Sequence, residues 1–270
     1  MEAKKAESLK KKFKEAELHL QIASKAIIER TNADIVQIDI PRTIRGNSRK
    51  EWFRIWPGAE GNRIEVVNVD KRIKQLVLMV HEPRREFFVE QRDWRTRKTK
   101  KIKQTTTDQK RHFLCGVDER QLFIADLPRG CTTVADAHSS LKTATVTFAE
   151  GKAPGKTVRQ GEWFFVHPTK EEKEAITAVT TKKRSAIMRK TAIGRGGNPH
   201  VAEELLRMPS DDVGLKLRHG YPAQSRDAIY VRGGIRHVDH KTVKFKTWRR
   251  VIRNNEPSGG SGMSGVNWID

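Results

Sequence analysis

Several residues near the C-terminal end of the chain have side chains that could bind a metal ion. His200, Glu203 and Glu204 occupy positions i, i+3 and i+4 of an apolar-polar segment that the sequence predicts to be a helix over 200–208. On a helix this spacing directs the imidazole and one or both carboxylates to the same side. Neutral imidazole and ionised carboxylate are common ligands of divalent cations.

A second group of polar residues follows about 30 positions later. Arg232, His237, Asp239 and His240 lie at the end of a predicted strand and in the turn after it. If the start of the 200–208 helix packs beside that turn, the histidines and Glu204 could hold a divalent cation and Arg232 could neutralise a phosphate. The candidate catalytic and metal-binding residues are therefore His200, Glu204, His237 and His240.

The spacing of this set matches no established metal-binding motif such as H-E-x-x-H. The alternative is that these are ordinary polar residues at a helix start and a turn, a position that suits Asp239 in particular. A metal-dependent nuclease is thus one of two functions that the residues leave open, with a divalent metal ion as its cofactor.

The last predicted strand, 242–252, could contact nucleic acid. Alternation along a strand places Lys244, Lys246, Trp248 and Arg250 on one face and apolar residues on the other. Cations around an exposed aromatic ring are the arrangement by which proteins hold single-stranded nucleic acid. Two structural roles compete with this one, because Lys on an edge strand prevents aggregation and Trp is usually buried.

Basic residues are concentrated rather than spread evenly. The chain has 54 Lys and Arg against 33 Asp and Glu, a formal net charge of +21, and the segments 92–111, 182–195 and 241–253 carry most of this excess. Such concentration favours a polyphosphate partner, because each neutralised phosphate releases a counterion. Solvated loops or a localisation signal are the alternative. The candidate nucleic-acid-binding residues are Arg95, Arg97, Lys98, Lys100, Lys101, Lys182, Lys183, Arg184, Arg189, Lys190, Arg195, Arg232, Lys244, Lys246, Trp248 and Arg250.

The composition excludes several other classes of protein. The chain has 270 residues, of which 36 % are hydrophobic, so it can bury a core, and two cysteines are too few for a disulfide framework. The longest aliphatic run, 76–80, is far shorter than a membrane span needs, and the N-terminus is charged rather than apolar. We expect no membrane partner and a cytoplasmic protein, or a nuclear one in a eukaryote.

The elements that must position these residues are predicted from hydrophobic periodicity and turn residues. We expect an α+β fold with an N-terminal amphipathic helix over 3–30, antiparallel sheets with hairpins, and a few short helices. The predicted strands are 33–40, 51–56, 63–69, 75–81, 85–90, 112–117, 121–126, 143–148, 162–167, 228–237 and 242–252. We expect hairpins between 75–81 and 85–90, between 112–117 and 121–126, and between 228–237 and 242–252. The remaining predicted helices are 133–141 and a segment from Thr169 to Val179, where Thr169 and Glu172 form a capping-box pattern.

The expected organisation is a helix-plus-sheet module over 1–93, a basic arm or linker over 94–111, an α+β module over 112–256 that ends in the basic hairpin, and a flexible tail over 257–270. We expect a nucleic-acid-binding protein, with single-stranded or structured RNA slightly favoured over DNA. A metal-dependent nuclease is the alternative, and a structural component of a ribonucleoprotein or virion is a third function.

Overall fold

The computed structural model describes residues 2–27, 34–45, 48–92, 95, 97, 99–119, 121–194, 199–209 and 227–257. The chain divides into two compact units, whose main segments are Met1–Leu141 and Lys142–Asn255. The boundary between these units follows Leu141, and the expected linker over 94–111 contains strands of the first unit at 99–105 and 109–111. The fold is α+β with antiparallel sheets and hairpins, as the sequence predicts.

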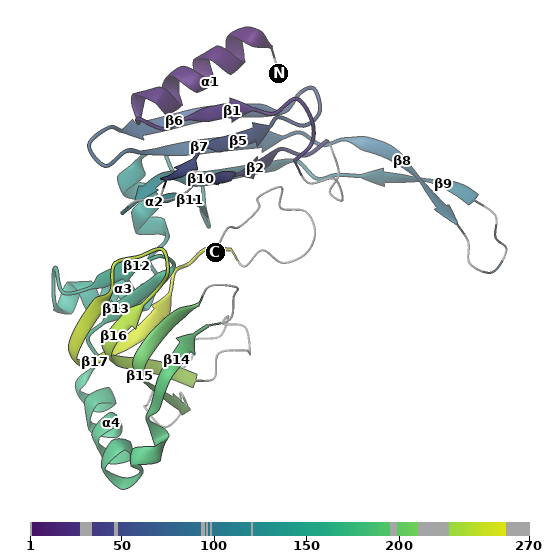
Figure 1. Ribbon diagram of the computed structural model, residues 1–270. Coiled ribbons are helices and arrows are strands. Elements are labelled where there is room, and N and C mark those ends of the chain that lie inside the picture. The colour runs from purple at the N-terminus through teal and green to yellow at the C-terminus, as the bar shows by residue number, and fades with distance from the viewer. Residues whose placement is uncertain are drawn as a thin grey trace. The chain divides into compact units, whose positions relative to one another are not determined.

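Within its described residues, the first unit contains two sheets, two small ribbons and two helices (Figure 1). A four-stranded antiparallel sheet has the order β11 (Gln121–Asp126), β10 (Gln109–Asp118), β7 (Gln75–Glu82) and β6 (Arg63–Asp70). A three-stranded sheet has the order β1 (Leu20–Ile22), β5 (Phe53–Trp56) and β2 (Gln37–Asp39), with β1 and β5 parallel. Two ribbons are formed by β3 (Arg42–Arg45) with β4 (Ser48–Glu51) and by β8 (Glu86–Arg92) with β9 (Thr99–Thr105).

The central strand β7 is buried on both of its faces, which explains its continuous apolar sequence. Leu76 and Leu78 face a core that includes Phe13 of helix α1 (Ala3–Glu15), whereas Val77 faces a second core that includes Val134 of helix α2 (Val134–Ser140). Helix α1 is shorter than the predicted helix over 3–30, because the chain turns at Ala16 and Glu17 and then forms β1.

The second unit is a six-stranded antiparallel sheet with helices on one face. Its strand order is β12 (Val158–Gln160), β13 (Trp163–Val166), β17 (Val243–Arg253), β16 (Asp227–Arg236), β15 (His200–Pro209) and β14 (Met188–Ile193). Helix α3 (Ala144–Lys152) packs on Phe164 and Val166, and helix α4 (Lys170–Lys182) packs on Tyr230 and its neighbours. A short 3-10 helix, η1 (Arg184–Ala186), follows α4.

The sheet is curved, and the face opposite the helices encloses a separate hydrophobic core. That core contains Phe165, Leu205, Val231 and Phe245 from four different strands. A Cβ on Gly194, at the end of β14, would lie only 2.8 Å from the ring of Trp163 in β13. Since β13 and β14 are separated by three strands in the sheet order, this approach shows that the sheet is strongly curved.

Two predicted elements have the wrong type of secondary structure. Segment 143–148 is the start of helix α3 and not a strand, because the Thr143 hydroxyl accepts a hydrogen bond from the Val146 N–H and caps the helix. Segment 200–208 is strand β15 and not a helix, because both of its edges pair with neighbouring strands. Tertiary pairing overrides local propensity in this segment.

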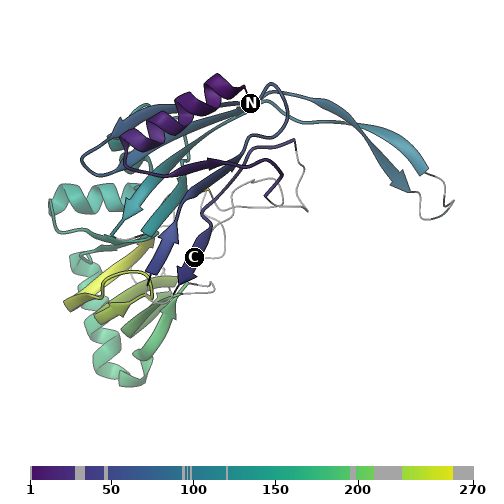
Figure 2. The same cartoon turned by 45° about the horizontal axis from the view of Figure 1, so that its top comes forward.

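Two of the predicted connections are confirmed, and a third is wrong. The β10–β11 and β16–β17 hairpins form as predicted. Segment 85–90 does not pair with 75–81, because β8 pairs with β9 and β7 pairs with β6 and β10. The β8–β9 ribbon extends away from the rest of the first unit (Figures 1 and 2). From here on, the arm means this ribbon, residues 86–105, and not the expected linker over 94–111.

Candidate functional site

Three histidines converge at one end of the curled sheet in the second unit. His200 is the first residue of β15, and His237 and His240 lie in the connection between β16 and β17. One ligand nitrogen from each of the three lies within 4.8 Å of the others. The ring centroids of His200 and His237 are 4.3 Å apart, and His240 lies 5.6 Å from His200 and 4.9 Å from His237. We call these three residues the histidine cluster.

His200 is the most buried member of the histidine cluster. Its side chain is 3 % exposed, and its Nε2 atom has no hydrogen-bond partner. Burial lowers the pKa of His200 to about 3, and the nearby His237 and His240 contribute to the same shift. At neutral pH this imidazole is therefore uncharged and keeps a free electron pair, which a metal ligand requires.

Gly161 lets the β12–β13 turn approach the histidine cluster. Its φ of +56° is in the left-handed region that favours glycine, and a Cβ there would lie 3.3 Å from His240 Nε2 and 3.4 Å from His200 Cε1. The preceding residue, Gln160, donates a hydrogen bond of 2.6 Å from Nε2 to the Lys241 carbonyl. The β12–β13 turn thus fixes the β16–β17 connection from outside the hairpin.

The β16–β17 connection also orients the His237 ring. The Asp239 N–H donates a hydrogen bond of 3.1 Å to His237 Nδ1. Nδ1 therefore carries an electron pair and no proton in this arrangement. A metal ion could bind His237 at Nδ1 in place of this N–H, or at Nε2 after the proton changes nitrogen.

The structure brings three of the four predicted metal ligands together and separates the fourth. Glu204 Oε2 instead accepts a hydrogen bond of 2.6 Å from Arg232 Nε. Glu203 Oε2 accepts one of 2.8 Å from the Gly234 N–H. The helical spacing that would have joined His200 to Glu204 does not apply, because both residues lie on a strand with a bulge between Ala202 and Glu204. Both glutamates hold β15 to β16.

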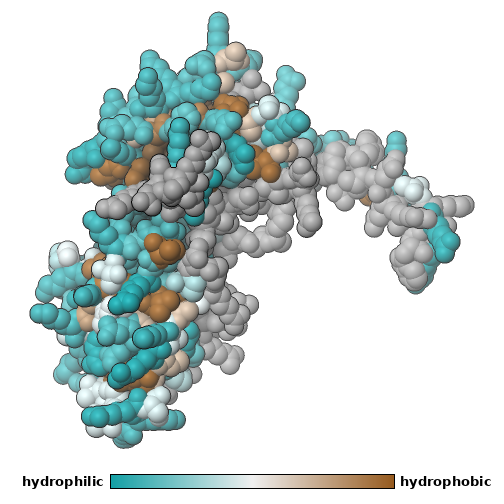
Figure 3. All heavy atoms as spheres, viewed as in Figure 1, coloured by the Kyte–Doolittle hydropathy of each residue, from teal (hydrophilic) through white to brown (hydrophobic). Residues whose placement is uncertain are grey.

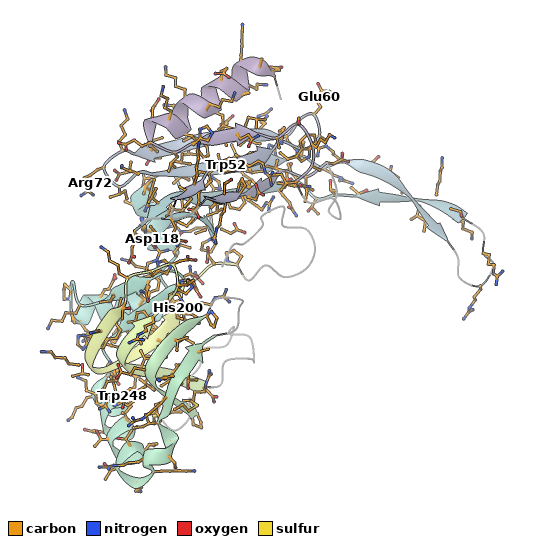
Figure 4. The ribbon with its side chains drawn as sticks, in the orientation of Figure 1. Trp52, Glu60, Arg72, Asp118, His200 and Trp248 are labelled. Atoms are coloured by element: carbon orange, nitrogen blue, oxygen red, sulfur yellow. The ribbon has the colours of Figure 1, made fainter. Side chains whose placement is uncertain are left out.

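The predicted aromatic-cation face of β17 is not open. Trp248 is half-buried and packs against the core beneath α4, and the Arg232 guanidinium lies 4.8 Å from the centroid of its ring. Arg250 Nη1 lies 3.0 Å from Oε1 of Glu172, which is 1 % exposed. Lys244 and Lys246 are exposed. Figure 4 shows Trp248 and His200 well separated along the second unit, so they do not form one site.

Arg250 completes a buried polar network. Glu172 Oε1 also accepts a hydrogen bond of 2.9 Å from the Tyr230 hydroxyl, and its Oε2 accepts one of 2.6 Å from the Thr169 N–H at the start of α4. The predicted capping box of Thr169 and Glu172 is thereby confirmed. Burial and the Glu172 carboxylate raise the pKa of Tyr230. Arg250 and Arg232 consequently neutralise carboxylates of this chain.

The remaining predicted nucleic-acid-binding residues lie mostly at the surface. In the second unit these are the exposed residues Lys182, Lys183, Arg184, Arg189 and Lys190, at the end of α4 and in the following segment. In the arm they are the exposed residues Arg95, Arg97, Lys100 and Lys101. Lys98 and Arg195 lie outside the residues that the structure describes.

Hydrogen bonds at its base join the arm to the rest of the first unit. At the base, Arg85 N–H donates to Thr106 Oγ1 at 2.9 Å, and Arg85 Nη2 donates to Asn62 Oδ1 at 2.6 Å and to the Glu60 carbonyl at 2.9 Å. Beyond the base, β8 and β9 pair only with each other in the described sheets. Figure 3 shows hydrophilic side chains at the far end of the arm.

The charge of the arm follows from its sequence. Between residues 86 and 105 the chain has seven Lys and Arg and three acidic residues. Within this stretch, Lys103 Nζ lies 2.6 Å from Glu86 Oε2. The arm therefore presents an excess of positive charge on a narrow two-stranded ribbon.

Sequence reasoning missed two contributions to these sites. Gly161 is not among the predicted site residues, although glycine directly before the predicted strand 162–167 is a signal of close backbone approach. The expected arm or linker over 94–111 also contains strand β9 (99–105), and its few apolar residues give no period-2 alternation that would predict this strand.

Comparisons with known proteins leave the function to be argued from these sites. No protein-family model, no curated protein and no solved structure matches the chain. Within the described residues, no helix is long and apolar enough to cross a membrane.

Proposed function

We propose that the protein binds nucleic acid through the basic arm. The observation that carries this proposal is an extended two-stranded ribbon with the exposed residues Arg97, Lys100 and Lys101, in a stretch, 86–105, that has seven Lys and Arg and three acidic residues. Phosphate contacts by such side chains supply affinity that does not depend on base sequence.

The shape of the arm favours a DNA duplex as the partner. Paired strands lie about 5 Å apart, and the major groove of B-DNA, about 12 Å wide, admits a two-stranded ribbon. The major groove of an A-form RNA helix is too narrow for side chains to read. The preference for single-stranded RNA depends on an open aromatic face, and Trp248 lacks one because the core beneath α4 and Arg232 cover it.

The metal-dependent nuclease expected as an alternative has weaker support. Glu204 is the only carboxylate in its proposed ligand set, and it is paired with Arg232. The described histidine cluster contains no carboxylate that could hold Mg²⁺ or act as a general base. We therefore treat the histidine cluster separately from nucleic-acid binding.

The test is the affinity of the purified protein for a 20-base-pair DNA duplex, a double-stranded RNA and a single strand of each, measured against salt concentration. We expect log Kd to change linearly with log salt, by about 0.9 for each phosphate contacted on the DNA duplex, and we expect this duplex to bind most tightly. Affinity that does not change with salt would reject the proposal. Tighter binding of a single strand at every salt concentration would instead point to a base-stacking surface.

A further inference from the structure

The histidine cluster is held in place by backbone pairing on adjacent strands. His200 pairs with Ile193 at the β14–β15 edge, and Ile235, two residues before His237, pairs with both Ala202 and Val243. His200 and the β16–β17 connection that carries His237 and His240 are therefore held side by side at one end of the sheet. The positions of their side chains are set by the fold and do not need a ligand to assemble them.

The buried His200 side chain costs folding free energy unless a ligand binds its unpartnered nitrogen. The Nε2 atom of His200 is buried and lacks a partner, and burying a polar group without a hydrogen bond costs free energy. The two other rings are packed against the same imidazole at centroid distances of 4.3 and 5.6 Å. One bound cation would satisfy His200 Nε2 and could take one nitrogen from each of the two other rings, because one ligand nitrogen of each histidine lies within 4.8 Å of the others.

The donor set selects the kind of cation. Three imidazole nitrogens suit Zn²⁺, Cu²⁺, Ni²⁺ or Fe²⁺, whereas Mg²⁺ and Ca²⁺ prefer oxygen ligands. Glu203 and Glu204 are bonded to Gly234 and Arg232, so neither carboxylate completes the set. Three protein ligands leave a fourth tetrahedral position for water or for a substrate atom.

We propose that His200, His237 and His240 form a binding site for one Zn²⁺-class transition-metal ion with an open coordination position. This site is independent of the arm and lies in the other unit of the chain. Gly161 keeps this site open, because a side chain at position 161 would lie in close contact with His200 and His240.

The first measurement is titration of the full-length, untagged protein with Zn²⁺ and separately with Mg²⁺, with metal content determined after dialysis. We expect one Zn²⁺ per chain and no saturable binding of Mg²⁺. Replacing Zn²⁺ by Co²⁺ should give the intense visible absorption of a tetrahedral or five-coordinate ion. In a spectrum of ¹⁵N-labelled protein, the Asp239 amide should shift on binding, because its hydrogen-bond acceptor is His237 Nδ1.

Two variants localise the site. His240→Gln keeps a polar side chain of similar size but removes the imidazole, and we expect it to weaken Zn²⁺ binding at least about 100-fold, since even outer-shell partners of a metal cost 10–100-fold. The matched control is His167→Gln, a half-buried histidine of the same unit that is not part of the cluster. We expect the control to keep the affinity of the unaltered chain.

Loss of Zn²⁺ binding in a variant can be distinguished from a folding defect, and the result does not depend on whether the arm binds nucleic acid. Circular dichroism and melting without metal show whether His240→Gln is folded, and His237→Gln serves as a second variant if it is not. Equal Zn²⁺ affinity and stoichiometry in the unaltered chain and in a folded cluster variant would overturn the proposal, as would the absence of saturable Zn²⁺ binding. DNA affinity measured with and without a chelator tests the arm independently of the cluster.

Discussion

Replacement of Arg97, Lys100 and Lys101 together by glutamine should weaken binding of a DNA duplex by about 10²–10³-fold at 0.1 M salt. These three side chains are exposed on the arm. If each contacts one phosphate, its loss removes about 0.9 from the slope of log Kd against log salt, so the triple variant should have a slope smaller by about 3. Fluorescence anisotropy of a labelled duplex at several salt concentrations measures both quantities.

The matched control removes the same charge from another part of the same unit. Lys4, Lys11 and Lys14 are exposed on helix α1, and their replacement by glutamine changes the net charge equally. We expect this control to retain the slope of the unaltered protein. Equal losses in the two triple variants would mean that total charge, and not the arm, determines binding.

Arg250→Ala should reduce the free energy of unfolding by about 3–5 kcal/mol. The change leaves the carboxylate of Glu172 buried without its cation, and breaking one side of a buried ion pair has a cost of that size. The Tyr230 hydroxyl and the Thr169 N–H still donate to this carboxylate, but neither carries a charge. Urea unfolding followed by circular dichroism measures the loss.

Two further variants separate the structural role of Arg250 from a binding role. Arg253→Ala removes an exposed arginine of the same strand and should change stability by no more than about 0.5 kcal/mol. Adding Glu172→Gln to Arg250→Ala removes the buried charge and should recover part of the loss. Unchanged stability of Arg250→Ala combined with weaker binding of nucleic acid would restore the role that the sequence predicts for this residue.

The sequence predicts the elements whose signals are local. The β16–β17 hairpin and the start of α4 at Thr169 follow from alternation and from a capping pattern that act within a few residues. Segment 200–208 could not be assigned in the same way, because its apolar residues fit a helix as well as a buried strand. Its pairing with β14 and β16 decides the question, and this pairing is a property of the whole sheet.

The difference between local signals and pairing across the sheet also explains which site residues the sequence predicts. His237 and His240 were placed together because they lie in one turn, and His200 joins them because β15 begins beside that turn. Only helical periodicity predicts Glu204 as a member of this set, and on a strand its carboxylate accepts a hydrogen bond from Arg232 instead. Basic residues are visible in any sequence, but the carboxylates that neutralise Arg232 and Arg250 come from strand β15 and from helix α4 and are recognised only in three dimensions.

Site-specific cross-linking tests most directly whether the arm contacts nucleic acid. Both native cysteines, Cys115 and Cys131, are buried, so a cysteine introduced at exposed Thr99 can be labelled selectively with a photoreactive group. The control is the same label at exposed Glu7 on helix α1. We predict efficient cross-linking of a DNA duplex from position 99, with little from position 7 and a decrease as salt is raised. Equal cross-linking from the two positions, or none from position 99 under conditions where the duplex is bound, would contradict the proposal that the arm is the nucleic-acid interface.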